Sequence, residues 1–369
     1  MNRSKVLDEF LLLAKHQKLP SKKKILDAAK RALFVLETEE SFYRERIPGT
    51  DVAGGLLDFR ALDERGGTKG AKGANGAIPT IIVPDIHARP EFIYNILNLD
   101  LKKIAPVFAE LSESPAGAKG AKGAKVIDAL EENKIRVICV GDILHAEGRA
   151  RERWAASYCA FEGGVYDSPS MREEMAEGLA ALLAVMKAKY LWPKNFHCLK
   201  GNHENIANER GEGNFPFRKF ASEGQMVFEF MKAVYGKEVL DAVYEFEKAL
   251  PLCACAGNFF VSHAEPMDFY SREELVEASL DERTVYGLTW TADDEARLGG
   301  VDKILTALCK PPKGVEARAI GGHRPVPENY LERQGGLYVQ IHNPKKQNIA
   351  VVMPDKTFDP NDGIMTVEE

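Results

Sequence analysis

The feature of this sequence that most constrains its fold is a pattern that occurs five times, in which a short apolar run ends at a residue able to bind a metal ion. The clearest example is residues 196–199, which the turn Gly201-Asn202-His203-Glu204 closely follows. Asn202 offers an amide oxygen, and His203 offers an imidazole that can titrate near neutral pH. Short apolar runs bounded by turn residues are typical of buried strands. The pattern therefore predicts a buried sheet with polar chemistry at the ends of its strands.

Four other apolar runs end in the same way, and each is short enough to be a strand. In layered α/β folds, binding sites gather where the carboxyl ends of the strands meet. We therefore expect the five strand ends to place their polar residues around one pocket. These residues are Asp85 and His87 after run 80–84, Asp142 after 135–140, Asn202 after 196–199, His263 after 259–262 and His323 after 317–320.

The six residues contain carboxylate, imidazole and amide groups and no thiolate, a set that suits manganese, iron or zinc. Asp85 and His87 lie two residues apart on an extended segment, so both can bind one ion. The two carboxylate oxygens of Asp142 can bridge this ion to a second one. We therefore predict two divalent metal ions (Mn, Fe or Zn), the second of which is completed by Asn202, His263 and His323.

Two adjacent divalent ions can clamp a phosphate ester, lower the pKa of a bridging water and stabilise the charge of an in-line displacement. The protein must then protonate the leaving alkoxide. His203 adjoins a ligand and is not needed as one, so we assign it as the general acid, with Glu204 as the residue that orients it. Three other histidines do not join this set. We interpret His197 and His342 as packed or surface residues within strands, and His16 as a residue of an N-terminal helix.

The ordered set of strings resembles the calcineurin-like metallophosphoesterase superfamily, and within it the phosphoprotein phosphatase family of serine/threonine phosphatases and their bacterial relatives. The resemblance spans about residues 79–353. It implies an α/β (α+β) fold, a four-layer β-sandwich flanked by helices, with a dinuclear metal centre that uses the ligands assigned above. The matching strings are Asp85-Ile86-His87, Gly141-Asp142, residues 201–204, residues 262–266, Leu288-Thr289-Trp290 with Asp293 nearby, and residues 322–325.

One string departs from the family pattern. In the family, the Gly-Asp string continues with a second Asp, which supports the acid histidine, and then with an Arg that holds phosphate. Here His145 stands at the position of that Asp, and the Arg is displaced. We expect His145 to pair with His203 or to touch phosphate. Because a guanidinium matches phosphate oxygens, the candidates for holding phosphate are Arg149, Arg297 and Arg324.

The sequence divides into three expected parts, which are an N-terminal helical extension with a flexible Gly/Ala/Lys linker (1–75), a catalytic domain (79–355) and a polar, frayed tail (356–369). A second Gly/Ala/Lys tract spans 116–124.

The sequence also predicts further elements besides the five strands. The expected helices are 4–18, 21–37, 90–111, 171–190, 218–235 and 238–250. We also expect a hairpin turn at Gly257-Asn258, a capping box from Ser271 to Glu274, and a final strand pair at 337–343 and 348–353.

The composition is that of a globular protein, with 45% hydrophobic and 28% charged residues. The net charge of −6 argues against nucleic acid as a partner and against a nuclease. No apolar run is long enough to span a membrane, so we expect a cytoplasmic protein and no membrane partner. The scattered cysteines imply no disulfide framework, which is consistent with a reducing compartment.

The sequence thus predicts a metal-dependent phosphoric ester hydrolase that cleaves phosphomonoesters through attack of metal-bound hydroxide. The first expected substrate is a phosphoserine or phosphothreonine protein, and a small phosphoester is the other expected partner. One alternative is a dinucleoside polyphosphate hydrolase, such as a diadenosine tetraphosphate hydrolase. A second alternative is a metal-binding interaction protein that has lost catalysis, because the string around His145 is altered.

Overall fold

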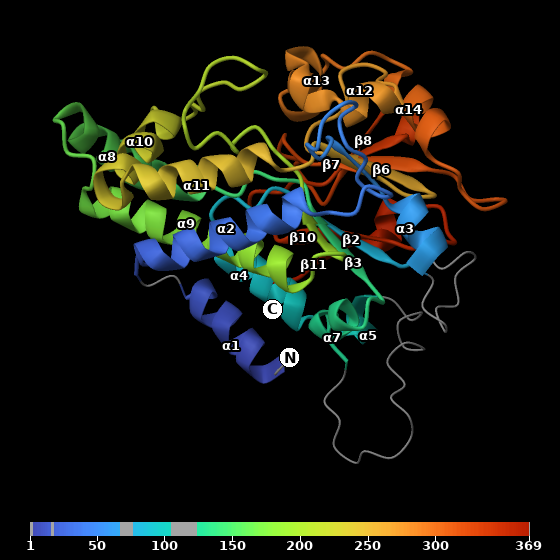
Figure 1. Ribbon diagram of the computed structural model, residues 1–369, viewed down its shortest axis with the longest axis horizontal. Coiled ribbons are helices and arrows are strands. Elements are labelled where there is room, and N and C mark those ends of the chain that lie inside the picture. The colour runs from blue at the N-terminus through green and yellow to red at the C-terminus, as the bar shows by residue number, and fades with distance from the viewer. Residues whose placement is uncertain (1–2, 16–17, 67–76, 105–123, 369) are drawn as a thin grey trace.

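Two β-sheets pack face to face, and helices cover the outer face of each sheet (Figure 1). The structure is a computed structural model that describes residues 3–15, 18–66, 77–104 and 124–368. A first sheet has the strand order β11-β10-β2-β3-β4, and a second has the order β1-β5-β6-β7-β9-β8. The molecule is therefore a four-layer α/β sandwich, as the sequence predicted.

The strand bounds agree with the apolar runs of the sequence. In the first sheet, β2, β3 and β4 are parallel neighbours, so their carboxyl ends meet at one edge. The strands of the first sheet are β11 (Ile364–Thr366), β10 (Asn348–Val352), β2 (Thr80–Val83), β3 (Arg136–Cys139) and β4 (Phe196–Cys198). Those of the second are β1 (Leu56–Asp58), β5 (Cys253–Cys255), β6 (Phe259–Ser262), β7 (Arg318–Gly321), β9 (Tyr338–Gln340) and β8 (Leu331–Arg333).

Alternation of side chains along the strands produces the layers. In β2, Ile82 points to the core between the sheets, whereas Ile81 and Val83 point to the core beneath the outer helices. In β3, Ile138 faces inward and Val137 faces outward. Because both faces of these strands are buried, they are apolar apart from Thr80 and Arg136 at their starts, which is close to the pattern expected for parallel strands covered on both sides.

The larger helical layer covers the first sheet. Its central helix α9 begins after Ser168, whose side chain accepts a hydrogen bond from the amide of Met171, and Pro169 occupies its first turn. The helices of this layer are α1 (Arg3–Ala14), α2 (Lys22–Glu37), α4 (Pro90–Asn98), α5 (Leu101–Ile104), α7 (Val126–Glu131), α8 (Arg151–Glu162), α9 (Pro169–Leu191), α10 (Glu223–Phe230), the π-helix η3 (Met231–Tyr235) and α11 (Lys237–Lys248).

The smaller helical layer covers the second sheet with α12 (Arg272–Val276), α13 (Glu282–Thr289) and α14 (Gly300–Leu308). The predicted capping box is present, since Ser271 and Glu274 exchange side-chain and backbone hydrogen bonds at the start of α12. The predicted hairpin of β5 and β6 is also present. The remaining elements are α3 (Phe59–Gly66), α15 (Pro360–Gly363), η2 (Gly148–Ala150), η4 (Ala278–Leu280) and η5 (Gln334–Gly336). Across the described segments, no helix is both long and apolar enough to cross a membrane.

The predicted pairing of the last two long strands is wrong. Strand β9 pairs with β7 and β8 in the second sheet, whereas β10 pairs with β2 and β11 in the first. Ile341 and Ala350 both lie in the core between the sheets, so the two segments face each other across this core instead of lying side by side. The turn between them crosses from one sheet to the other.

The predicted frayed tail is also wrong for residues 360–367. Strand β11 pairs antiparallel with β10, and the amide of Val367 donates to the carbonyl of Gln347 at 2.9 Å. Ile364 closes the edge of the core between the sheets, and Val367 packs in the outer core. The apolar residues among the polar ones are therefore sufficient to hold this segment.

The N-terminal residues are part of the sandwich, which corrects the expected boundary at residue 75. Phe10 of α1 and Ile25 of α2 lie in the same core as α9 and the first sheet, and β1 is the edge strand of the second sheet. Helix α4 ends at Asn98, short of the predicted 90–111, and residues 105–111 lie outside the described residues. Most of both Gly/Ala/Lys tracts, 67–76 and 116–123, also falls outside them.

A buried ionic cluster fixes the N-terminal segment to this core. Glu39 accepts hydrogen bonds from Lys189 of α9 at 2.5 Å and from Arg44 at 2.7 Å, and the Nδ1 atom of His197 in β4 lies 3.4 Å from the same carboxylate. All four side chains are at most 2% exposed. Although burial opposes ionisation, the two cations hold the pKa of Glu39 well below its usual value. A carboxylate is therefore ionised here and joins three separate elements.

We predict that Glu39→Gln destabilises the fold by about 3–5 kcal/mol, because it leaves two buried cations without their shared counterion. The neighbouring Glu40→Gln is the matched control, since Glu40 forms a half-exposed ion pair with Lys194. Loss of this pair should lower the free energy of unfolding by about 1 kcal/mol or less. Denaturant unfolding at pH 7 measures both.

The pH dependence of this effect has a defined sign. A carboxylate with a depressed folded-state pKa stabilises the fold above its unfolded pKa, near 4.5, and loses that contribution as the pH falls below it. The difference in the free energy of unfolding between wild type and Glu39→Gln should therefore become smaller below pH 4.5. A constant difference from pH 7 to pH 3 would contradict the ionic explanation.

Candidate metal centre

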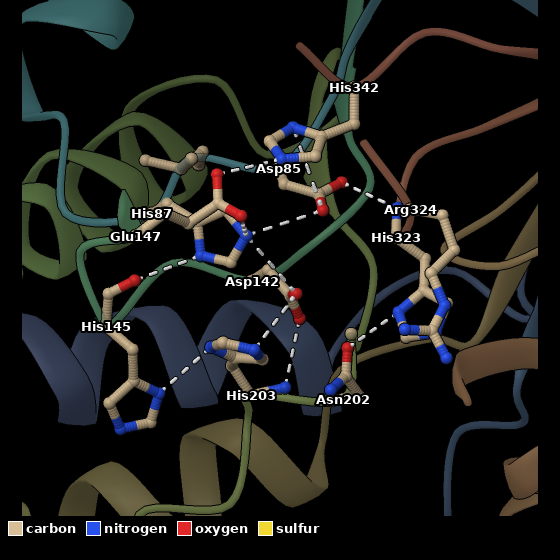
Figure 2. Close-up of polar contacts among 12 residues, drawn as sticks. Asp85, His87, Asp142, His145, Glu147, Asn202, His203, His323, Arg324 and His342 are labelled. Atoms are coloured by element: carbon tan, nitrogen blue, oxygen red, sulfur yellow. Dashed lines mark hydrogen bonds and ion pairs between the residues drawn. The ribbon is translucent and has the colours of Figure 1, made fainter. Parts of the chain in front are cut away.

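The six predicted ligands meet at the edge of the sandwich where strands of both sheets end (Figure 2). Asp85, Asp142 and Asn202 follow β2, β3 and β4, while His263 and His323 follow β6 and β7. Five of the six side chains are buried, and His323 is partly exposed. Buried polar groups concentrated in this way require partners that compensate for their lost hydration.

The first group of ligand atoms surrounds His87. Its Nε2 atom lies 3.5 Å from Oδ2 of Asp85 and 3.8 Å from Oδ2 of Asp142. Its Nδ1 atom is 3.0 Å from the carbonyl of His145 and donates to it, because a carbonyl can only accept. In its neutral form the ring of His87 therefore carries its lone pair on Nε2, toward the two carboxylates, as a metal ligand requires.

The second group surrounds Asn202. Its Oδ1 atom lies 2.9 Å from Nε2 of His263 and 3.0 Å from Nδ1 of His323. The Nε2 atom of His263 is also 3.4 Å from Oδ1 of Asp142. Because Nδ1 of His263 donates to the carbonyl of Val140 at 3.1 Å, its lone pair is on Nε2. The four donor atoms face one another, which is the arrangement that a shared cation would stabilise.

The carboxylate of Asp142 joins the two groups, with Oδ2 toward His87 and Oδ1 toward His263. Burial and the nearby Asp85 raise the pKa of Asp142 well above its usual value. A cation on each side would reverse this effect by stabilising the charged form. The two oxygens of Asp142 therefore face the two groups of donor atoms, one oxygen to each group.

Two observations test whether this donor set fits metal ions. Oδ2 of Asp85 is buried and has no hydrogen-bond partner within the described part of the chain, although it points at His87. Gly322 and Gly201 leave no room for a side chain, because a Cβ atom would overlap Asp85 at the first position and Asp142 at the second. The loops are thus packed around the carboxylates, and the oxygen and nitrogen donors suit divalent ions.

The loops that carry the ligands have unusual backbone conformations. His87, Asp142 and His323 have φ values of 44°, 52° and 66°, in the left-handed region that residues with a Cβ seldom adopt. His145 shares this conformation, with φ of 65°. Such conformations persist only where the surrounding structure enforces them, and they concentrate at functional sites.

His203 and His145 form a pair beside the metal ligands. Their Nδ1 atoms are 3.0 Å apart, and Nε2 of His203 lies 3.5 Å from Oδ2 of Asp142. The ring of Phe217 packs against both histidines, with its centroid 3.7 Å from the ring centroid of His203 and 5.2 Å from that of His145. Burial and the neighbouring histidines lower the pKa of His203, and burial together with His87 lowers the pKa of His145 to about 3. The pair is therefore neutral near pH 7.

Glu204 contacts other atoms than we predicted. Its carboxylate accepts hydrogen bonds from the backbone amides of Gly201 at 2.7 Å, and of Asp142 and Ile143 at 2.8 Å. These bonds join the loop after β4 to the loop after β3. Glu204 therefore holds the backbone of two ligand loops, whereas the ring of His203 is held by His145 and Phe217.

The three predicted arginines lie in different places. Arg324 follows His323 and lies beside it, and its buried Nε atom has no hydrogen-bond partner among the residues described (Figure 2). Arg149 instead forms an ion pair with Glu177 at 2.6 Å and donates to the carbonyl of Ala88. Arg297 pairs with Asp268 and is 76% exposed. Only Arg324 lies beside a predicted ligand with a buried donor still unpaired.

Two residues that the sequence did not single out also reach this site. His342 is fully buried, 3.8 Å from Asp85, and donates to Glu147 at 2.9 Å. Glu147 also lies 3.6 Å from Nε2 of His87. The sequence signal for His342 was present, since it follows an apolar run as the other ligands do, but we placed it inside a longer strand. Strand β9 ends at Gln340.

A cavity of about 850 Å³ opens beside Glu147. Arg89, Arg149, Lys219 and Lys345 line it together with acidic residues, and Phe220 and Pro325 add apolar surface. The Nζ atom of Lys219 is 3.2 Å from the Glu147 carboxylate, which separates the cavity from His87. The metal centre thus has a charged cavity on one side.

A solved structure has this arrangement of elements. A protein serine/threonine phosphatase from Saccharomyces cerevisiae matches 95% of this chain and 90% of its own, with a TM-score of 0.52 and 14% sequence identity. This chain has the fold of a protein phosphatase. The resemblance to the phosphoprotein phosphatase family that the motifs predicted is therefore confirmed at the level of the fold.

A second match is weaker. A cold-active protein-tyrosine phosphatase of a psychrophile Shewanella sp. covers 79% of this chain at 12% identity, and its TM-score of 0.42 is too low to support a conclusion. No protein-family model matches the sequence, and a comparison with curated proteins gives no match.

We predict that Gly322→Ala weakens metal binding by about 10- to 100-fold, the usual effect of displacing a group that positions a ligand. The added methyl group would push the Asp85 carboxylate out of place. Gly257→Ala is the matched control, because a Cβ there would make only an ordinary contact, 3.5 Å from the carbonyl of Lys310. Calorimetric titration with Mn²⁺ measures both, and unchanged affinity in Gly322→Ala would show that the site is not packed as described.

Proposed function

We propose that this protein is a dinuclear metal-dependent phosphoesterase that hydrolyses phosphomonoesters. The observation that carries the proposal is the Asp142 carboxylate, which lies between the group around His87 and the group around Asn202. The phosphatase fold supports the same proposed activity. When bound, two divalent ions supply Lewis acidity and a water molecule of lowered pKa.

The residues of the chain then orient the substrate and move a proton. Nε2 of His203 faces the bridging carboxylate and is therefore the atom placed to donate to a leaving oxygen. That atom carries the proton when Nδ1 of His203 accepts the hydrogen of His145 Nδ1. Phe217 covers this pair and excludes water from it.

Arg324 is the residue proposed to hold a phosphate oxygen. Its guanidinium lies next to His323 and keeps a buried donor unpaired, which a bidentate phosphate contact would satisfy. Arg149 and Arg297 remain candidates from the sequence, but their ion pairs with Glu177 and Asp268 would have to open first.

For the substrate, we propose a phosphoserine or phosphothreonine protein, since the fold is that of a serine/threonine phosphatase. The charged cavity with Phe220 at its wall favours one alternative, a dinucleoside polyphosphate. Mn²⁺-dependent hydrolysis of a phosphothreonine peptide beside diadenosine tetraphosphate distinguishes the two. Bound metal without turnover on either substrate or on an aryl phosphate would favour an interaction protein that has lost catalysis.

We predict that Asp142→Asn abolishes turnover, because a neutral amide cannot hold two cations together. Hydrolysis of an aryl phosphate at saturating Mn²⁺ measures this effect. The control is Asp241→Asn, which alters an exposed carboxylate of α11 that pairs with Lys237. Near-normal activity of Asp142→Asn would contradict the mechanism.

We predict that His203→Asn lowers kcat for alkyl phosphates by about 10²- to 10⁴-fold and affects aryl phosphates much less, because an aryloxide leaves without being protonated. Rates on both substrate classes, measured with the same preparation, give the comparison. Equal losses on the two classes would mean that His203 is not the proton donor.

The unusual partner of His203 gives a further test of the same assignment. A carboxylate at position 145 would stabilise a protonated His203 better than an imidazole does. We therefore expect His145→Asp to raise the ratio of alkyl to aryl phosphate turnover, whereas His145→Asn, which adds no charge, should not. A ratio unaffected by both changes would separate His145 from the proton transfer.

A further inference from the structure

His342 has one ring nitrogen that nothing in the fold accounts for. Its side chain is fully buried and follows β9 by two residues. Nδ1 lies 3.8 Å from Oδ2 of Asp85, which is too far for a hydrogen bond, and neither atom has a hydrogen-bond partner among the described residues. Two buried polar atoms that face each other without bonding require a third partner between them.

Glu147 determines which nitrogen of His342 carries the proton. The carboxylate accepts a hydrogen bond from Nε2 at 2.9 Å, so the proton is on Nε2 and the lone pair is on Nδ1. A carboxylate that holds the far nitrogen of a histidine is the usual support of a metal-binding imidazole. The contact thus gives His342 the tautomer and the orientation of a ligand.

The free nitrogen of His342 points to the same place as the first group of ligands. Asp85, His87 and His342 each offer one atom within 4.8 Å of the others, and the rings of the two histidines are 5.2 Å apart. Figure 2 shows His342 on the side of Asp85 opposite Asn202. His342 therefore belongs to the first group of donor atoms.

We propose that Nδ1 of His342 is the fourth protein ligand of the first metal ion and that Glu147 is its positioning residue. The inference rests on the dinuclear centre proposed above and adds to it. The first ion is then held by two imidazoles and two carboxylates, counting the bridging Asp142. The second ion is held by two imidazoles, one carboxylate and one amide. Because the first site has the greater negative charge, it binds its ion more tightly.

The first experiment counts bound metal in the full-length His342→Gln variant. After dialysis against limiting Mn²⁺, wild type should retain two ions, whereas the variant should retain one, with affinity at the other site weakened by at least 10- to 100-fold. His197→Gln is the matched control, because His197 is equally buried but contacts Lys189 and Glu39 instead of the site. Wild-type stoichiometry and affinity in His342→Gln would overturn the proposal.

Glu147→Gln tests the positioning role without removing the ligand. It should weaken the first site by about 10- to 100-fold, while saturating Mn²⁺ restores two ions. Melting temperatures with EDTA and with Mn²⁺ separate metal binding from folding. A purely structural Glu147 would lower both temperatures equally, and that result would overturn its assignment.

If His342→Gln does not fold, X-ray absorption spectroscopy of the zinc-loaded wild type tests the proposal by counting the histidine ligands of the bound ions. The proposal requires four imidazoles shared between two ions, and a spectrum that fits three would overturn it. The outcomes also separate the two proposals. Wild type that binds no metal contradicts the dinuclear phosphoesterase itself, whereas two bound ions with an unaffected His342→Gln variant contradict only the role of His342.

Discussion

The arrangement of this site depends on the carboxylate of Glu204. Three backbone amides donate to it, from Gly201 after β4 and from Asp142 and Ile143 after β3. Several hydrogen bonds donated to one buried carboxylate fix two loops that would otherwise be free to move apart. Asn202 and Asp142 lie on these loops, so their separation, and with it the distance between the two groups of donor atoms, follows from this contact.

The helical layer provides a second support, on the far side of the loop after β3. Ala146 is held through both backbone groups, since its amide donates to Glu174 at 2.8 Å and its carbonyl accepts from the indole of Trp154 at 2.8 Å. Arg153 of α8 pairs with the same Glu174. Helices α8 and α9 thereby fix the position of His145. This part of the chain thus has a structural role at the site.

The proposed function combines a dinuclear arrangement of ligands with a histidine pair, His203 and His145, as the proton donor. A carboxylate next to the acid histidine would favour its charged form, whereas His145 leaves a neutral pair beneath Phe217. A neutral imidazole is a weaker acid, so leaving groups that need little protonation are favoured. Peptide phosphates and phosphoanhydrides differ in this respect, so the proposed mechanism predicts that His145 affects the choice of substrate.

The sequence by itself determined the strands and the residues that end them, because a buried parallel strand must be apolar and ligands must be polar. All six predicted ligands, which the structure brings together at one edge of the sandwich, were therefore predicted from local pattern. Only the tertiary structure assigned β9 and β10 to different sheets, brought His342 to Asp85 and tied Glu204 to backbone amides. The contact of His342 with Asp85, and those of Glu204 with the amides of Asp142 and Ile143, join residues about 60 to 260 positions apart. The periodicity of a short segment contains no information about such contacts.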